Sequence, residues 1–152
     1  MHLLLWLASA LAAPWQSLAP GLELAEFPSP VAPTYRALVQ GYRLLTCTGA
    51  VTWKDGPKIW SHAVLGIDGR GRPLLIHVRS PYNTAVMTRI LRDLPLDLQR
   101  LMYLEGGPEA TLVVSVPGRR EQWVGSYETG FHESDDNRDA WPIPNVIGVR
   151  PR

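Results

Sequence analysis

The chain contains one cysteine, Cys47, so it cannot form an internal disulfide. The hydrophobic core must therefore stabilise the fold without a covalent cross-link. Cys47 lies between two threonines, and no histidine or acidic residue is found within several positions of it. This setting favours a small buried or half-buried side chain over a catalytic nucleophile.

An excess of charge of one sign is also lacking, because 15 Lys and Arg residues nearly balance 14 Asp and Glu residues. The basic residues form no cluster, which argues against a nucleic-acid partner. No apolar run reaches the roughly 20 residues that a membrane-spanning helix needs. The sequence therefore predicts neither a nucleic-acid partner nor a membrane span.

Several catalytic motifs are absent: HExxH, paired CxxC, GxSxG and a phosphate-binding glycine loop. Zinc peptidases, serine hydrolases and nucleotide-binding proteins thus lose their usual sequence support. The acidic segment 129–139 could bind calcium, but its spacing does not match the twelve-residue calcium loop. We interpret it as a solvated surface loop and expect neither a metal nor a cofactor.

The N-terminus has the pattern of an export signal. A continuous apolar run, Leu3–Ala12, ends in the small-x-small pattern Ala10-Leu11-Ala12, which predicts cleavage after Ala12. His2 is the only basic side chain before the run, and the alternative is a buried N-terminal helix. We therefore predict a signal peptide at 1–12, an N-terminal extended segment at 13–34 and one domain at 35–152, exported to the periplasm or secreted.

The 14 prolines and 13 glycines argue against a helical bundle and favour short strands joined by turns. Asp-Gly between two apolar runs predicts a hairpin of strands 60–67 and 73–79. His62 and His77 both lie on this hairpin, and the face that each occupies depends on the register. Further strands are expected at 22–27, 50–53, 111–116, 122–127 and 146–149.

One segment has the period of an amphipathic helix. Met87, Ile90, Leu91 and Leu94 fall at i, i+3, i+4 and i+7, and Pro95 ends the pattern. Either Asn83 or Ser80 can cap its start. The expected fold is α+β, with a mostly antiparallel twisted sheet and one main helix, 84–94, packed on one face.

The stretch Leu101–Leu112 contains the strongest candidate site. Its apolar start runs into Glu105, the pair Gly106-Gly107, Pro108 and Glu109, which predicts a strand end, a sharp turn and a return strand. Paired glycines allow another group to approach the backbone closely. Glu105 is a candidate general acid or base with Glu109 as its partner, as in glycoside hydrolysis. The alternative is an ordinary hairpin with an acidic tip.

Three cationic or titratable side chains could hold an anion: Arg43, Arg79 and His62. The planar guanidinium of arginine suits phosphate oxygens. For the two arginines the alternative is an ordinary surface ion pair, and for His62 it is a hydrogen-bonded histidine in the core.

The order of motifs resembles that of the phosphodiester glycosidase family, which includes the enzyme that uncovers mannose 6-phosphate by removing N-acetylglucosamine. Leu104–Leu112 resembles the family's Leu-Asp-Gly-Gly-x-Ser/Thr segment, and Pro142–Gly148 resembles its Pro-x-Pro-Asn-x-x-Gly. Ser61–Asp68 is similar to the Arg-Ser/Thr-Ala-x-Gly strand. Fainter likenesses are Val39–Leu44, to a glutamine-containing strand, and Trp15–Leu22, to an opening Trp-x-x-Leu-x-Pro-Gly.

The chain also departs from this pattern. No counterpart of the family's Asn-Ala/Gly-Gly-Met/Phe-Phe segment is found between Phe27 and Tyr35. His62 stands where the family has arginine, and Glu105 stands where it has aspartate. The resemblance therefore implies a shortened member of the family.

The resemblance implies hydrolysis of a sugar from a sugar-phosphate diester. Glu105 would act in general acid/base catalysis, and His62 and Arg79 would orient the phosphate. The remaining substrate-binding residues implied are Gly106, Gly107, Glu109 and Asn145.

A second function is implied by the missing segment: a non-catalytic or vestigial envelope protein that binds carbohydrate. Four tryptophans could stack on sugars, although core packing is the default for each: Trp53, Trp60, Trp123 and Trp141. A sheet edge left exposed by the missing segment could pair two copies into a homo-oligomer.

Overall fold

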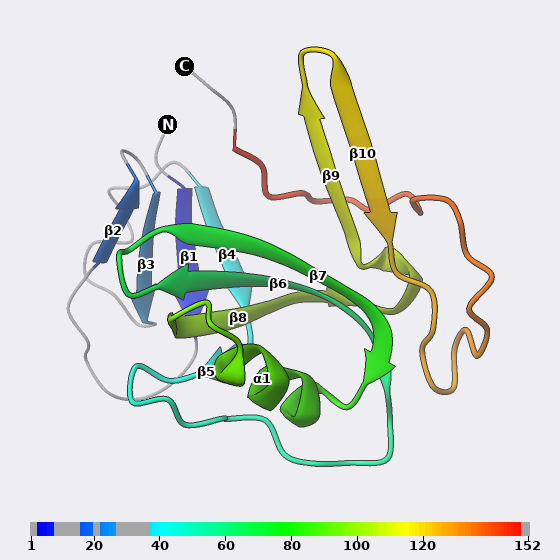
Figure 1. Cartoon of the computed structure of the whole chain (residues 1–152), viewed down its shortest axis with the longest axis horizontal. Helices are drawn as coiled ribbons and strands as arrows, with labels where there is room; N and C mark the ends of the chain where they lie inside the picture. The colour runs from blue at the N-terminus through cyan, green and yellow to red at the C-terminus, as the bar shows by residue number, and fades with distance from the viewer. Residues whose placement is uncertain (1–2, 8–15, 20–21, 27–36, 150–152) are drawn as a thin grey trace.

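The computed structural model describes residues 3–7, 16–19, 22–26 and 37–149. A four-stranded antiparallel sheet forms the centre of the molecule, with the strand order β5-β8-β6-β7 (Figure 1). Its strands are β5 (Arg43–Leu45), β6 (Trp60–Asp68), β7 (Pro73–Tyr82) and β8 (Leu98–Gly106). One helix, α1 (Thr84–Asp93), packs on one face, so the expected α+β fold is confirmed.

A second four-stranded sheet contains the strands near the N-terminus, in the order β2-β3-β1-β4. Its strands are β1 (Leu3–Leu7), β2 (Gln16–Ala19), β3 (Leu22–Glu26) and β4 (Ala37–Gly41). β1 lies in parallel between β3 and β4. The predicted signal-peptide cleavage would remove β1, so this sheet belongs to the uncleaved chain.

The hairpin β6–β7 owes its register to one buried carboxylate. Asp68 Oδ1 accepts hydrogen bonds from the N–H groups of Arg70 at 2.9 Å and Arg72 at 2.8 Å, and Oδ2 pairs with Arg72 Nε at 2.6 Å. The backbone hydrogen bond from Arg72, with the others, holds the pKa of Asp68 below its usual value. Gly71 supplies the positive φ of +75° that closes the turn. The predicted Asp-Gly hairpin is confirmed.

Asn83 starts α1, because its side chain accepts a hydrogen bond from Ala85 N at 2.9 Å. Asn83 Nδ2 also donates to Gly56 O at 2.9 Å, which attaches the preceding loop to the helix. The buried face differs from the predicted stripe, since Ile90 and Leu94 are 42% and 44% exposed. The side chains that face the sheet are Thr84, Ala85, Met87, Thr88 and Leu91.

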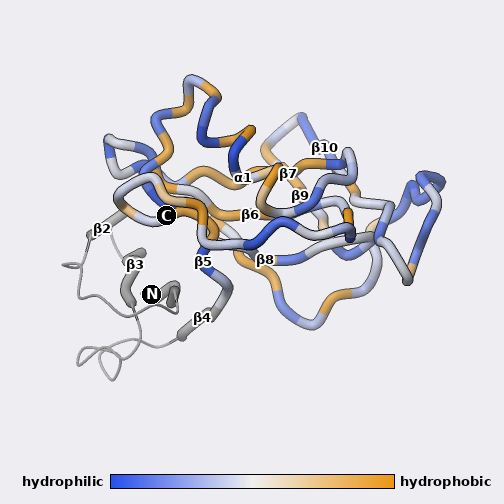
Figure 2. The backbone as a smooth tube through the Cα atoms, turned by 90° about the horizontal axis from the view of Figure 1, so that it is seen from below, coloured by the Kyte–Doolittle hydropathy of each residue, from blue (hydrophilic) through white to orange (hydrophobic). Residues whose placement is uncertain are grey.

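The core lies between α1 and the main sheet. Hydrophobic residues are frequent along β6 and the strands beside it (Figure 2). Its buried members are Leu44, Leu45, Val64, Met87, Leu91, Leu98 and Leu101. Within the described part of the chain, no helix is long and apolar enough to cross a membrane.

The predicted return strand after Gly106-Gly107 is present but does not pair with β8. The turn contains a short 3-10 helix, Gly107–Glu109, and leads to β9 (Thr111–Val116), which pairs with β10 (Arg119–Val124) in a separate hairpin. That hairpin projects away from the main sheet (Figure 1). The simple hairpin with an acidic tip is therefore wrong, because the 3-10 turn directs the chain out of the sheet.

Three local predictions are also wrong. Residues 146–149 form no strand, and residues 50–53 contribute only an isolated bridge between Leu45 and Val51. Cys47 is exposed in a turn. Residues 50–52 lie beside the short strand β5, with Thr52 N donating to Leu44 O at 3.0 Å, and this contact is too brief to form a strand. Residues 27–34 of the predicted N-terminal extended segment lie outside the described residues.

His62 is fully buried beneath α1, with Nε2 at 3.1 Å from Thr84 Oγ1 and with Nδ1 unpartnered among the described residues. Burial lowers its pKa from 6.5 to about 4, so the ring is neutral at neutral pH. At a pH between these two pKa values, His62 is protonated in the unfolded chain but neutral in the folded chain.

We expect the free energy of unfolding to fall as the pH drops from about 6.5 to about 4. Once His62 is protonated in both states, the total loss due to this residue is about 3 kcal/mol. Urea unfolding at several pH values measures this loss. His62→Leu removes the proton site, so its unfolding free energy should depend less on pH. An unchanged pH dependence in His62→Leu would assign the effect to another group.

Candidate functional site

The Gly106-Gly107 turn at the end of β8 is filled by the protein's own side chains. A Cβ on Gly107, whose φ is +62°, would overlap Glu128 Oε2. A Cβ on Gly106 would overlap Tyr103 Oη and lie 2.7 Å from Trp60 Cδ1. The close approach predicted from the glycine pair is therefore observed, and the approaching groups are a carboxylate and two aromatic rings.

Glu128 is a functional candidate that the sequence did not reveal. It is half-buried against Gly107, and burial raises its pKa, assisted by the negative charges of Glu109 and Glu105 and opposed by Lys58. Burial, with the charges of Glu105 and Glu128, also raises the pKa of Tyr103. Glu128 thus keeps its proton to higher pH than an isolated glutamate, as a general acid must.

Isolated backbone bridges and hydrogen bonds hold Glu128 in place. Its backbone bridges both Trp60 at the start of β6 and His132 in the following turn. Thr129 N donates to Ile59 O at 3.1 Å, and Thr129 Oγ1 accepts from Ile59 N at 3.1 Å. No local pattern marks this position, because its significance comes from a contact between residues 107 and 128.

Glu105 lies at the exposed rim of the same turn. Its Oε1 accepts a hydrogen bond from Gly106 N at 3.0 Å. Glu109, its predicted partner, is half-buried at the end of the 3-10 turn and acts on Glu128 through its charge. Three carboxyl groups therefore share this end of the sheet, and Glu128 is the one whose pKa is raised by burial.

The register separates His62 from Glu105. Ala63 pairs with both Glu105 and His77, whereas His62 pairs with Gly106 and Val78. Because neighbouring residues of a strand point to opposite faces, His62 faces α1 and Glu105 faces the other side. The structure does not bring the two predicted catalytic residues together.

His77 is the histidine on the Glu105 face, in one row with Ala63 and Glu105. Its Nε2 lies 3.1 Å from Ala110 O, and burial lowers its pKa. Its ring thus connects β7 to the start of the β9–β10 hairpin and is neutral at neutral pH.

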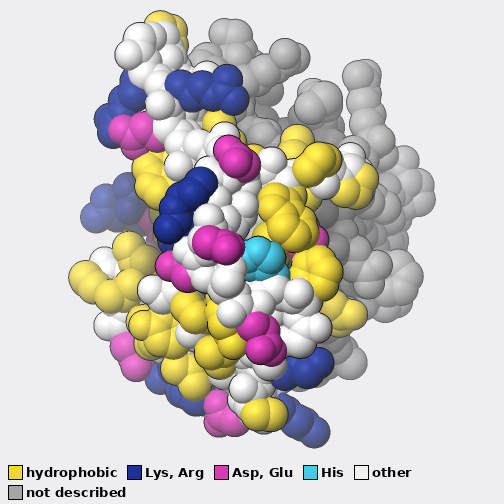
Figure 3. Space-filling view, turned by 90° about the vertical axis from the view of Figure 1, so that its right-hand side faces the viewer, with side chains coloured by type: hydrophobic (Ala, Val, Ile, Leu, Met, Phe, Trp, Pro, Cys, Tyr) yellow, Lys and Arg dark blue, Asp and Glu magenta, His cyan; other side chains and the backbone are white. Residues whose placement is uncertain are grey.

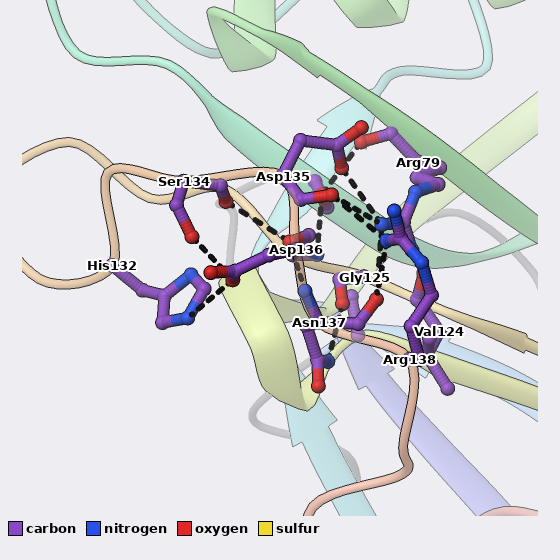
Figure 4. A network of polar contacts seen from close by, with 12 residues as sticks. Arg79, Val124, Gly125, His132, Ser134, Asp135, Asp136, Asn137 and Arg138 are labelled. Carbon is purple, nitrogen blue, oxygen red and sulfur yellow. Dashed lines mark hydrogen bonds and ion pairs between the residues drawn. The ribbon is translucent and has the colours of Figure 1, made fainter.

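Arg79 serves as a clamp on the loop that follows β10 (Figure 4). Nη1 donates to Val124 O at 2.7 Å, and Nη2 donates to Asp135 O at 3.2 Å and Asn137 O at 3.0 Å. Nη2 also pairs with the Asp135 carboxylate at 2.8 Å. The guanidinium predicted to orient phosphate is therefore engaged by the protein.

Buried polar groups extend this clamp. Ser61 Oγ donates to Arg79 O at 2.6 Å and accepts from Ser126 N at 3.0 Å. Asn137 N donates to Ser126 Oγ at 3.2 Å, and Asn137 Nδ2 donates to Gly125 O at 2.7 Å. Together these groups fix segment 124–137 against β6 and β7.

The other predicted anion and substrate ligands are dispersed. Arg43 is on β5, the opposite edge of the main sheet from β7. Asn145 is exposed in the segment after Trp141, and its side chain makes no hydrogen bond to another described residue. Lys58, exposed before β6, is the cation whose charge acts on Glu128. In the described ranges, no group of three or more potential metal ligands is found.

A family model described as phosphodiester glycosidase (NAGPA) matches residues 17–150. No curated protein and no solved structure matches the chain significantly.

Replacing Arg79 by Gln should lower the free energy of unfolding by about 2 kcal/mol, because three carbonyl groups, two of them in part-buried hydrogen bonds, lose their donor. Hydrogen exchange should increase in segment 124–137. Arg119→Gln is the matched control, since its guanidinium pairs with Glu121 on the exposed hairpin and should contribute less than about 1 kcal/mol. Equal stability of the two variants would contradict the clamp.

Proposed function

This chain belongs to the phosphodiester glycosidase family, and from that premise we propose that it hydrolyses a sugar from a sugar-phosphate diester at the Gly106-Gly107 turn. Water adds to the anomeric carbon, the bond from that carbon to the phosphate oxygen breaks, and a free sugar and a phosphate monoester leave. The observation that carries this proposal is half-buried Glu128, whose carboxyl group lies against Gly107 and whose pKa is raised by burial and by the charges of Glu109 and Glu105.

In the proposed mechanism Glu128 is the general acid and protonates the leaving oxygen. Its raised pKa supports that role, because glycosidases need one carboxyl group that retains its proton. Glu105 acts as the base or nucleophile on the exposed side of the turn, where Gly106 N–H orients one of its oxygens. Glu109 contributes the negative charge that keeps Glu128 protonated.

His62 and Arg79 enter the proposal as positioning residues. His62 lies between the rings of Trp60 and Tyr103, at centroid distances of 5.7 and 6.2 Å, and these two rings pack over Gly106. Arg79 holds the loop that continues from Glu128. The phosphate is proposed to bind at exposed Lys58, whose charge acts on Glu128, and Asn145 remains a proposed sugar ligand.

A second candidate function is sugar binding without catalysis. It is supported by the state of the two predicted phosphate ligands, since His62 is buried and neutral and Arg79 is engaged by Asp135 and three carbonyl groups. With fewer free cations, the site would retain its affinity for the sugar but lose much of its affinity for phosphate.

We also propose export with cleavage after Ala12, and a homodimer formed through β7, a ten-residue outer strand of the main sheet. Native mass spectrometry of the protein recovered from the periplasm or medium tests both. The expected result is a subunit lacking residues 1–12 and a native mass of two subunits. A full-length subunit would contradict the cleavage, and a monomer at high concentration would contradict the pairing.

The methyl phosphodiester of N-acetylglucosamine 1-phosphate is a suitable test substrate, with release of free N-acetylglucosamine as the measurement. Glu128→Gln and Glu105→Gln should each lower kcat by a factor of about 100 or more. Glu121→Gln, on the exposed hairpin, is the control and should leave kcat unchanged.

The pH profile of kcat distinguishes the general acid, Glu128, from the base or nucleophile, Glu105. Wild-type kcat should fall as the pH rises through the raised pKa of Glu128, and Glu128→Gln should lack this alkaline limb. No hydrolysis by well-folded wild type would favour the binding function. Hydrolysis that survives in both variants would contradict the assignment of these carboxyl groups.

A further inference from the structure

The loop after Glu128 carries an aromatic group that core packing does not explain. Phe131 is 60% exposed, and its ring packs edge-to-face on Trp141 at a centroid distance of 5.9 Å. His132 packs edge-to-face on Trp141 at 5.8 Å. The surrounding segment is polar and acidic, so Phe131 presents a large apolar ring at a polar surface, where it is available to stack on a ligand.

This aromatic group lies beside the proposed general acid. Phe131 N donates to Glu128 O at 3.2 Å and His132 N donates to the same oxygen at 3.0 Å. The first bond closes a four-residue turn, so the Cα atoms of Glu128 and Phe131 are less than about 7 Å apart. A ligand stacked on Phe131 would therefore lie beside the backbone turn that carries Glu128.

Hydrogen-bonding groups border the aromatic rings. Asp136 Oδ1 accepts from Ser134 Oγ and lies 3.5 Å from His132 Nε2 (Figure 4). Asp136 is largely exposed, and its remaining lone pairs can accept hydrogen bonds from a ligand. His132 Nδ1 is buried and has no partner among the described residues, so the ring contributes to the site through its packing on Trp141.

The chemistry of this face selects a class of ligand. Hydrophobic, acidic and some basic side chains, with a histidine, share the face seen in Figure 3. The carboxylates of Glu133 and Asp136 repel a phosphate but accept hydrogen bonds from hydroxyl groups. The apolar C–H face of a pyranose can pack on an aromatic ring, whose face is electron-rich. An uncharged sugar therefore fits better than an anion.

We propose that Phe131, Trp141, His132 and Asp136 form a subsite that binds the uncharged sugar ring, with Phe131 as the stacking platform. This inference rests on the proposed function for the placement of the sugar beside Glu128. It assigns the sugar and the phosphate to separate parts of the site, the sugar to the loop 131–141 and the phosphate to Lys58.

Isothermal titration of the full chain with methyl N-acetyl-α-glucosaminide tests the subsite, because this probe has no phosphate and requires no catalysis. We expect saturable binding in wild type and at least a tenfold weaker Kd in Phe131→Ala. Phe131→Tyr keeps the ring and should bind as wild type does. Trp123→Ala, which removes a 41% exposed ring on the β9–β10 hairpin, is the control and should also bind normally.

Absence of saturable binding to folded wild type would overturn the proposal, as would equal Kd values for Phe131→Ala and wild type. Displacement of the sugar by inorganic phosphate would overturn the separation of the two subsites. Sugar binding that is lost in Phe131→Ala, in a protein that hydrolyses no diester, would support the subsite while contradicting the proposed hydrolysis. Circular dichroism confirms the fold of each variant, and Phe131→Leu, which also lacks the aromatic face, should weaken binding as Phe131→Ala does.

Discussion

The contact between the Cα atom of Gly107 and the carboxyl group of Glu128 is the constraint on which the site depends. Two features disfavour a side chain at position 107. The backbone has a left-handed φ, and the Glu128 oxygen occupies the space that a Cβ would need. Because Glu128 is also bridged to Trp60 and His132, the contact joins β8, β6 and the loop after β10 at one point. The position of the carboxyl group, its burial and its proton affinity all follow from this junction.

Three carboxyl groups lie at this junction, and few positive charges compensate for them. Burial raises the pKa of Glu128, the charges of Glu109 and Glu105 raise it further, and Lys58 is the described residue that lowers it. The guanidinium of Arg79 is engaged by Asp135 and by carbonyl groups of the loop after β10. It therefore stabilises that loop against β7 and does not act on Glu128 through its charge.

Local signals in the sequence predicted the elements whose causes are local. The Asp68 turn and the Asn83 cap are each determined by side chains within a few residues, and both were confirmed. The helix face was predicted less well, because Thr84 and Thr88 are buried through hydrogen bonds that hydrophobic periodicity ignores. Glu128 could not be found in this way, since its environment is made by Gly107, 21 positions earlier.

The separation of His62 from Glu105 shows the same limit for strand register. A shift in the pairing between Ala63 and Val64 opposes Glu105 to Ala63 and Tyr103 to Val64, so the alternation of faces along β8 is interrupted. A sequence pattern with a strict period of two contains no mark of that irregularity.

The exchange of arginine for histidine at position 62, relative to the family pattern that the sequence resembles, follows from burial. This position has no solvent exposure and has Thr84 as its hydrogen-bond partner, with no carboxylate bonded to it among the described residues. A guanidinium, which cannot lose its charge, would be strongly destabilised there, whereas a histidine becomes neutral as its pKa falls. The proposed site thus has one cation fewer on the α1 side of the sheet, which supports the proposal that the sugar is recognised more strongly than its phosphate.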